Sequence, residues 1–317
     1  MRFCDRAPAM DRQWRAPTPL GVGLSYLPGV DPALYRSGLI DFVEISPDIL
    51  CRPRRGGRGM QLDPRLLDSA RDTCGDLPIV VHGVELSIGS AGRWNDDYVA
   101  ILEAFQRTWP FQWHSEHIHF QTIDLGDGRG ETDIGVPLPL PFSREAADLV
   151  AERAAALGAL FGVPFCLENG AHYLGELPCS DGIADESAFL NRIAVGGDCG
   201  LLLDLHNLYC NAINNGIDAM AMIDRLRLDR VCELHVAGGH WANGYRLDSH
   251  KGRVPEPVWV LLDEVLPRCP NLGGVLFEIM PDHALEAGTG LIAEEIARAR
   301  GAWEQHKTAK RAELCPA

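Results

Sequence analysis

Short apolar segments alternate with longer segments of helical periodicity along almost the whole chain. The short segments are rich in Val, Ile, Leu and Phe and are bounded by Gly or Pro, which is typical of buried strands. Strands that alternate with helices in this way form parallel sheets with crossover helices. The predicted strands are residues 21–26, 42–46, 78–86, 113–120, 165–170, 201–206, 231–236 and 274–279.

The longer segments repeat apolar residues at helical spacing, and several begin with a recognisable cap. Asp63 precedes Pro64 at the start of one helix, and Ser143 precedes another; both are preferred residue types for those positions. The predicted helices are residues 31–37, 63–74, 95–108, 143–161, 186–195, 217–226, 257–266 and 285–308. Residues 52–59 and 122–141 are predicted loops, and the length of the second is typical of an active-site lid.

Eight strands and about eight helices predict an α/β fold, a single (β/α)8 TIM barrel over residues 19–308. Residues 1–18 are predicted to be a flexible N-terminal lead-in and residues 309–317 a C-terminal tail. A doubly wound open sheet is the alternative, but it normally has a glycine-rich phosphate turn after an early strand, and no such turn is found in the sequence.

Composition narrows the class of function. The chain has 317 residues, 46% hydrophobic and 23% charged, with a net charge of −15. A strong negative charge argues against a nucleic-acid partner. No apolar run approaches the roughly 18 residues of a membrane helix, and the N-terminus has no apolar signal segment, so we expect a cytoplasmic protein without a membrane partner. The ten cysteines never form C-x-x-C and are expected to be reduced core residues.

Acids and histidines recur at the carboxyl ends of the predicted strands, where TIM barrels carry their chemistry. An extended Asp-x-His run after the seventh strand would add two more side chains on one side. So many carboxylates and imidazoles in one barrel mouth would be costly without cations among them. The ligand types suit Zn²⁺, Fe²⁺ or Mn²⁺. The candidate metal ligands are His82, His117, Glu168, Asp204, Asn207, His235, Asp248, His250 and Glu278.

For several other polar residues, more than one role is consistent with the sequence. His206 is a candidate ligand, a hydrogen-bond donor to a ligand, or a substrate contact, and Glu44 is either an active-site acid or a salt-bridge partner. Glu116 and His119 either support the ligands or pack in the core. The remaining histidines are expected in loops or at the surface: His114, His172, His240 and His283.

Together these segments resemble the methanobactin biosynthesis oxidase-like family of multinuclear non-heme iron-dependent oxidative enzymes. The resemblance extends over residues 21–282, and its most specific runs are HGVELSIGS, SEH and LLLDLHN. Further matching segments are FVEIS, PLPLPF, LENGAHYL, ELHVAGGH, LDSH, PEPVWVLLDE and FEIM.

The resemblance implies a TIM barrel that holds two or three iron ions, as a mixture of Fe(II) and Fe(III), with O2 as co-substrate. It implies oxidation of a side chain, often cysteine, in a ribosomally synthesised precursor peptide that a small partner protein presents. By position, the candidate metal ligands named above match the metal ligands of the family. Glu44 and His206 are the candidate catalytic residues.

The sequence also departs from the family pattern. Glu44 is followed by ISPDIL, where other members often have a second acid and an aromatic residue. Asp204 is followed by Leu-His-Asn, where many members have an Asn-Asn pair. His250 is followed by Lys251, where an Asp is frequent. The ligand order also resembles the endonuclease IV and sugar-isomerase barrels, so a Zn²⁺- or Mn²⁺-dependent hydrolase or isomerase is the alternative. A barrel that only stores metal or binds a partner is a third hypothesis.

Overall fold

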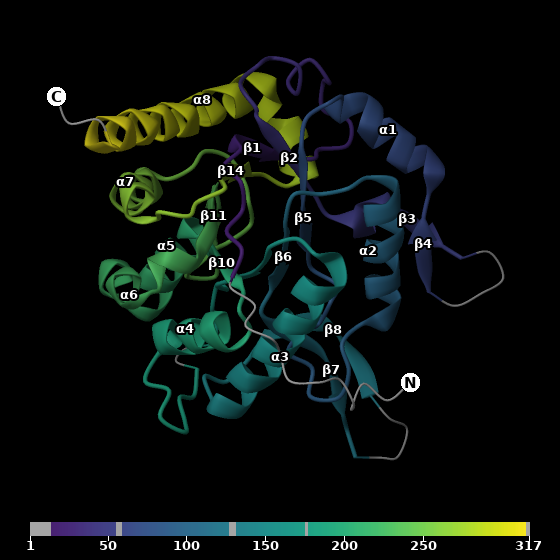
Figure 1. Cartoon of the computed structure of the whole chain (residues 1–317), viewed down its shortest axis with the longest axis vertical. Coiled ribbons are helices and arrows are strands. Elements are labelled where there is room, and N and C mark those ends of the chain that lie inside the picture. Colours follow the sequence, from purple (N-terminus) through teal and green to yellow (C-terminus); the bar gives the residue numbers. More distant parts are fainter. Residues whose placement is uncertain (1–13, 55–58, 127–130, 175–176, 315–317) are drawn as a thin grey trace.

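Eight parallel strands pair side by side and close on themselves in the order β1-β14-β11-β10-β9-β6-β5-β2 (Figure 1). The computed structural model describes residues 14–54, 59–126, 131–174 and 177–314. The closed barrel confirms the predicted TIM-barrel fold and excludes the open sheet. Its strands are β1 (Gly21–Ser25), β2 (Phe42–Ile45), β5 (Ile79–Gly83), β6 (His114–His117), β9 (Phe165–Glu168), β10 (Gly200–Asp204), β11 (Val231–Ala237) and β14 (Gly274–Glu278).

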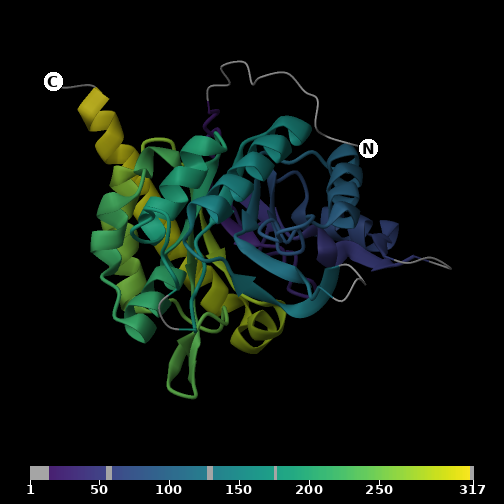
Figure 2. The same cartoon turned by 90° about the horizontal axis from the view of Figure 1, so that it is seen from below.

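Helices surround the barrel, and Figures 1 and 2 show them on its outside. Their apolar faces pack on the outward side chains of the strands and form the main core. The helices are α1 (Pro64–Cys74), α2 (Asp96–Thr108), α3 (Arg144–Phe161), α4 (Glu186–Gly196), α5 (Leu205–Asn215), α6 (Ala219–Arg225), α7 (Glu256–Val265) and α8 (Pro281–Leu314). Helix α8 is interrupted at Gly288, whose φ of 76° is not helical.

The predicted caps are present. The Asp63 side chain accepts a hydrogen bond from the Arg65 backbone N–H, and Ser143 accepts one from the Ala146 N–H. Each satisfies one of the N–H groups that the first turn of a helix leaves free. The local sequence therefore determines where α1 and α3 begin.

Inside the barrel, apolar side chains form a layer below the strand ends. Phe42, Val80, Trp113 and Leu276 make one small cluster, separate from the main core. Successive side chains on a strand alternate between the two faces, so the residue two positions after an inward apolar side chain also points inward. This alternation places a polar layer directly above the apolar one. The pairs are Phe42/Glu44, Val80/His82, Leu202/Asp204 and Leu276/Glu278.

Two glycines make room for Phe42 in this layer. A Cβ on Gly23 would lie 2.4 Å from the Phe42 ring, and one on Gly274 would lie 2.5 Å from it. Both glycines are on strands that flank the closure of the barrel, where β1 pairs with β14 and β2. Phe42 is fully buried, so the absence of a side chain at these positions determines how the barrel closes around it.

Two predicted elements were wrong. Residues 31–37 form turns, because a segment this short nucleates a helix poorly and the Tyr35 hydroxyl instead bonds the backbone of Ser25 and Leu27. The predicted loop 122–141 contains an antiparallel hairpin of β7 (His119–Asp124) and β8 (Glu131–Pro139). Pro137 lies in β8, where an exposed edge strand tolerates proline.

Three further elements were not predicted. Helix α5 follows β10 directly, so His206 lies on a helix and not at the end of a strand. Residues after β11 form a small hairpin of β12 (His240–Ala242) and β13 (Tyr245–Leu247). The expected loop 52–59 overlaps a hairpin of β3 (Cys51–Pro53) and β4 (Met60–Leu62), and its residues 55–58 are outside the described ranges.

Some expectations remain predictions. Residues 1–13 of the expected lead-in lie outside the described ranges, and α8 continues to Leu314, past the predicted end at residue 308. The boundaries 1–18, 19–308 and 309–317 are therefore untested. In the described part of the chain, no helix combines the length and apolar character needed to cross a membrane.

The close packing at the barrel seam leads to a prediction. Gly274→Ala should lower the free energy of unfolding by about 1–3 kcal/mol, because the new methyl group would press on the Phe42 ring. The matched control is Gly301→Ala in α8, where no atom lies within 4 Å of the added Cβ; it should raise stability by about 0.5–1 kcal/mol. Urea unfolding of both variants measures this, and equal changes would contradict the packing argument.

Candidate metal centre

The candidate ligands predicted from the sequence converge at the carboxyl-terminal mouth of the barrel. His117, Glu168, Asp204 and Glu278 are the last residues of their strands. Glu44, His82 and His235 lie one or two residues before the ends of theirs. Asn207 is in the first turn of α5, and Asp248 and His250 follow β13.

One side of the mouth joins two histidines to a carboxylate. The Nε2 atoms of His82 and His117 are 3.0 Å apart. The Glu168 Oε2 atom lies 3.4 Å from His82 Nε2 and 2.8 Å from His117 Nδ1. Ser115 lies 2.9 Å from His82 Nδ1 and fixes the ring from below. The three side chains thus turn nitrogen and oxygen atoms toward one point.

On the opposite side, His235 lies between several carboxylates and is completely buried. Its Nδ1 atom is 3.1 Å from Glu278 Oε2, and its Nε2 atom is 3.2 Å from Glu44 Oε2. Glu233 Oε1 lies deeper, 3.7 Å from the same Nε2 atom. The Trp113 indole N–H donates to Glu233 Oε2 at 2.7 Å. Glu44 therefore faces the site, which is the position expected of an active-site acid.

The Asp-x-His run approaches from a loop. Asp248 Oδ2 lies 3.0 Å from His250 Nε2, and His250 Nδ1 lies 3.2 Å from Glu278 Oε1. The two side chains do meet, but His250 has a φ of 49°, so the backbone is left-handed there and not extended. This conformation is uncommon for residues other than glycine and is typical of functional sites. The Tyr173 hydroxyl accepts a hydrogen bond from the Asp248 backbone N–H at 2.8 Å.

His206 lies behind Asp248, away from the cavity. It is fully buried, and its Nδ1 atom is 2.7 Å from Asp248 Oδ1. A Cβ on Gly239 would lie 2.7 Å from the His206 ring. The glycine after β11 therefore gives the imidazole the room to reach Asp248.

An asparagine ladder on α5 fixes the loop that follows Glu168. Asn207, Asn211 and Asn215 recur every fourth residue, which places them on one face of the helix. Their side-chain amides donate to the backbone carbonyls of Asn169, Gly170 and His172 at 3.0, 2.9 and 3.0 Å. These bonds therefore fix the loop after Glu168 against α5 and hold Asn207 beside Glu168.

Burial and crowding shift the pKa values of these groups. Burial raises the pKa of Glu44. It also raises the pKa of Asp204, and the nearby carboxylates Asp248 and Glu168 raise it further. Burial alone would lower the pKa of His82, but Glu44 and Glu168 outweigh it and raise the value to about 10. The carboxylates of the mouth therefore disfavour one another's ionised form, and their charge favours the protonated form of the nearby histidine.

Several oxygen atoms in the mouth have no hydrogen-bond partner. Asp204 Oδ2 and Asn207 Oδ1 are two of them. Glu44 Oε2 and Glu168 Oε2 lie near His235 and His117 but make no well-aligned hydrogen bond, and all four residues are buried. Buried polar atoms are usually paired, so unpaired carboxylate oxygens that face one another indicate a missing positive partner. Nitrogen and oxygen ligands of these types fit divalent iron, zinc or manganese. The residues present therefore fit a metal centre.

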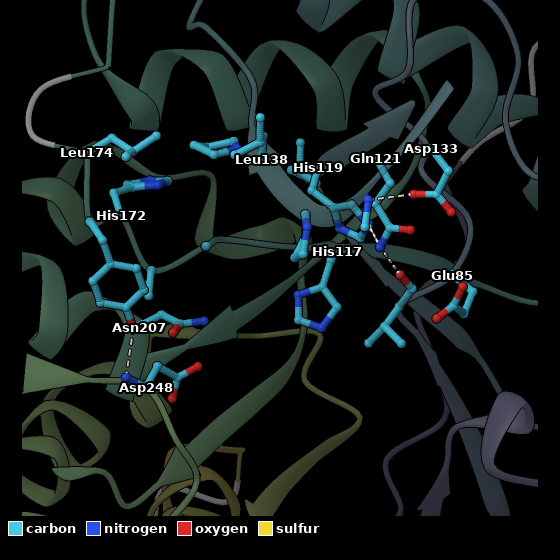
Figure 3. A pocket seen from close by; sticks show the side chains of 18 residues that line it. Glu85, His117, His119, Gln121, Asp133, Leu138, His172, Leu174, Asn207 and Asp248 are labelled. Carbon is cyan, nitrogen blue, oxygen red and sulfur yellow. Dashed lines mark hydrogen bonds between the residues drawn. The ribbon is translucent and has the colours of Figure 1, made fainter. Parts of the chain in front are cut away.

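A cavity of about 720 Å³ opens onto the centre. Figure 3 shows His117 near its middle, Asn207 and Asp248 at one side, and Glu85 and Asp133 at the far end. Strand β8 contributes Leu138 to the wall, so the hairpin that replaces the predicted lid does border the site. The volume lies in the ordinary range for ligand pockets.

Two histidines that were expected in loops or at the surface are buried. His114 is on the outward face of β6 and lies 2.8 Å from Glu116, and both are fully buried. His172 does lie in a loop, the one after β9, but it is buried beside Glu186, at 3.1 Å. His119 lines the cavity, and burial lowers its pKa to about 3. The surface prediction holds for His240, which is exposed.

Sequence reasoning also missed residues that shape the centre. Glu233 precedes His235 by two positions, a spacing that puts both inside the barrel. The four-residue spacing of Asn211 from Asn207 was likewise visible in the sequence. Tyr173 gave no local signal, because its partner Asp248 is 75 positions away.

Comparisons with known proteins agree with this architecture. The family model described as RiPP precursor modification enzyme MbnB/TglH/ChrH matches residues 21–303; RiPPs are ribosomally synthesised and post-translationally modified peptides. A UPF0276 protein of Rhizorhabdus wittichii is 32% identical over 260 residues, 82% of this chain and 86% of the relative. A UPF0276 protein of Anaeromyxobacter is 33% identical over 233 residues, 72% of this chain and 75% of the relative.

The chain therefore belongs to the MbnB/TglH/ChrH family, which confirms the resemblance noted in the sequence. Among solved structures, 3-keto-D-glucoside 4-epimerase from E. coli aligns with a TM-score of 0.51 and 15% identity. The alignment covers 88% of this chain and 98% of the epimerase. At this identity the likeness supports the barrel fold and says nothing of the reaction.

The asparagine ladder leads to a prediction. In Asn211→Ala the His172 N–H and the Gly170 carbonyl lose their partners, and each unsatisfied buried group costs about 1–3 kcal/mol. We expect a loss of about 2–4 kcal/mol in the free energy of unfolding, measured with urea. Asn271→Ala removes one partly buried bond to the Asp229 carbonyl and serves as the control. A loss no larger than in the control would contradict the role of the ladder.

Proposed function

We propose that this chain is a multinuclear iron enzyme that uses O2 to oxidise a side chain, of cysteine or another residue, in a ribosomally synthesised precursor peptide. The family supports a role in precursor modification. The observation that supports a multinuclear metal centre is the overlap among the groups of potential ligands in the barrel mouth. A mixture of Fe(II) and Fe(III), in two or three ions, is the cofactor that we propose.

Potential ligand atoms gather in overlapping groups within the described residues, with the atoms of each group within 4.8 Å of one another. One group is His82, His117 and Glu168, and a second is Glu168, Asp204 and His235. A third is Asp204, His250 and Glu278. Glu168 and Asp204 each belong to two groups, and a carboxylate has two oxygens with which to bridge neighbouring ions. This sharing supports more than one ion.

When bound, iron ions would supply Lewis acidity and the one-electron chemistry that O2 activation needs. His82, His117, Glu168, Asp204, His235, His250 and Glu278 would hold them. Asn207 and Asp248 border the same cavity and would complete the set. Their amide and carboxylate oxygens are suitable ligands.

The other residues would position these ligands. His206 is buried behind Asp248 and donates toward its Oδ1 atom, so we assign it a positioning role. Such partners orient metal-binding side chains. Glu44 approaches His235 Nε2 and Glu278, so it would orient His235 or bind an ion itself.

The substrate would reach the centre through the cavity of about 720 Å³. In Figure 3 its lining side chains extend from His172 past His117 to Glu85, a spread that suits an extended peptide segment with one residue near His117. The protein would fix that residue near the ions and limit the access of water. A small peptide-recognition protein that presents the precursor is part of the proposal.

A second candidate is a hydrolase or isomerase that uses Zn²⁺ or Mn²⁺. Glu168, Asp204 and His235 could hold a single divalent ion, which is sufficient for metal-assisted hydrolysis or isomerisation. The shared carboxylates favour several ions over one but suit zinc or manganese as well as iron, so the preference for oxidation of a precursor peptide rests on the family match.

The Asp-x-His loop provides a test of the ligand set. Asp248→Ala and His250→Ala should weaken metal binding by about 10–100-fold, because each removes a proposed ligand or the partner that orients it. Asp282→Ala, which changes an exposed acid near the mouth, should keep the wild-type stoichiometry. Elemental analysis after dialysis against graded chelator measures the difference. Full metal content in both loop variants would show that this pair does not belong to the centre.

The nature of the metal is tested by reconstitution. Protein purified without oxygen and loaded with Fe(II) should consume O2 and change the mass of a precursor peptide. Protein loaded with Zn²⁺ should do neither, because zinc has no redox chemistry. Turnover of a phosphodiester or a ketose by the Zn²⁺ or Mn²⁺ form without O2 would instead support the second candidate.

A further inference from the structure

A second cavity lies next to the one that opens onto the metal centre, and His172 borders both. Its volume is about 370 Å³, and its walls come from the loop after β9 and from helices α4, α5 and α6. A gap of about 20 Å³ also borders on His172 and touches Glu168 on one side and Glu186 and Phe142 on the other. The two cavities and the gap therefore meet at His172, and the gap reaches Glu168 of the candidate metal centre.

The backbone of His172 is fixed by hydrogen bonds, while its ring has only the Glu186 carboxylate beside it. Its N–H donates to Asn211 Oδ1 at 2.7 Å, and its carbonyl accepts from Asn215 Nδ2 at 3.0 Å. Both ring nitrogens lack a hydrogen bond, although the side chain is only about 9% exposed. Figure 3 shows the ring at the end of the first cavity, above Asn207. A buried imidazole whose Nδ1 atom has no partner is uncommon, and a bound ligand would supply one.

Glu186 is the second polar group at this wall. Its Oε1 atom is 3.1 Å from His172 Nε2, and its side chain is also about 9% exposed. Beyond their contact with each other, the pair keeps His172 Nδ1 and the second Glu186 oxygen for other partners. An extended peptide brings one N–H and one carbonyl per residue, and each needs a partner when it leaves water. The pair matches these needs.

The rest of the outer cavity is mostly apolar. Phe142, Leu177, Ile217 and Met222 line it, and Ala184 lies at an exposed position on its rim. Asp185 and Arg225 also border it, and their charges pair with each other at 2.9 Å. A pocket with apolar walls and a few polar groups at one side holds an apolar group and fixes its orientation. Its volume is large enough for a single leucine- or phenylalanine-sized side chain.

We propose that the outer cavity is a specificity subsite for an apolar residue of the precursor peptide, next to the segment that lies at the metal centre. The inference rests on the proposed peptide substrate. His172 and Glu186 bind the peptide backbone where it passes between the cavities, and the apolar walls receive the neighbouring side chain. A metal ion does not suit this place, because His172 and Glu186 are absent from the ligand groups of the described residues.

Chemical labelling of Cys179 tests whether a peptide binds to the outer cavity, without requiring catalysis. Cys179 lines the outer cavity and is exposed, whereas the other free cysteines of the described residues are buried or half-buried. The protein is prepared with Cys4→Ser and Cys315→Ser, loaded with metal, and treated with N-ethylmaleimide. Short synthetic peptides are added with a central serine in place of cysteine, next to either leucine or aspartate. The leucine peptide at about ten times its Kd should slow labelling of Cys179 about tenfold.

The kinetic test uses a variant that fills the cavity from its rim. Ala184→Trp should raise the KM for the cysteine-containing leucine peptide about tenfold or more, with kcat and metal content near wild type. Val260→Trp places the same side chain at an exposed position on α7, outside the cavity, and should behave as wild type. Equal KM values in the two variants, or equal or no protection by the leucine and aspartate peptides, would overturn the subsite.

The two proposals fail in different ways. Protection of Cys179 by the serine-containing leucine peptide, without iron-dependent oxidation of the cysteine-containing leucine peptide, would contradict the oxidative function and leave the subsite standing. Iron-dependent oxidation with an unchanged KM in Ala184→Trp would contradict the subsite and leave the oxidative function standing.

Discussion

The structure depends on the balance between buried carboxylates and the positive charge near them. Glu44, Glu168, Asp204 and Glu278 face one another in the mouth of the barrel, with little or no exposure. Isolated buried charges are costly, and like charges at this distance raise the cost. Three histidines offset part of it, as the raised pKa values of His82, His235 and His250 indicate. Cations among the carboxylates would offset the rest.

The barrel makes this crowding possible. Strand alternation puts a polar residue two positions above each apolar residue of the interior, and closure brings the strand ends together. Phe42 and Trp113 fill the barrel below the site, and Trp113 also binds Glu233 under His235. The asparagine ladder then holds the loop beyond Glu168 against α5. A rigid interior and a fixed loop keep the ligands close despite their repulsion.

Much of this could be predicted from the sequence, because strands and their terminal residues leave a local pattern. The ends of the strands carried Glu168, Asp204 and Glu278, and the barrel follows from their order. The helix α5 could not be predicted in the same way, since its asparagines favour helix weakly and it begins within the apolar run of β10. Its stability comes from bonds to a loop more than 30 positions away. The burial of His114 and His172 likewise depends on contacts with outer helices, which no local pattern records.

The most direct test of the account is a crystal structure of protein prepared anaerobically with iron, with diffraction data collected on both sides of the iron absorption edge. The account predicts two or three anomalous peaks at the carboxyl ends of β9, β10 and β14, with Glu168 and Asp204 each near more than one peak. Well-ordered side chains with no anomalous density among them would contradict it.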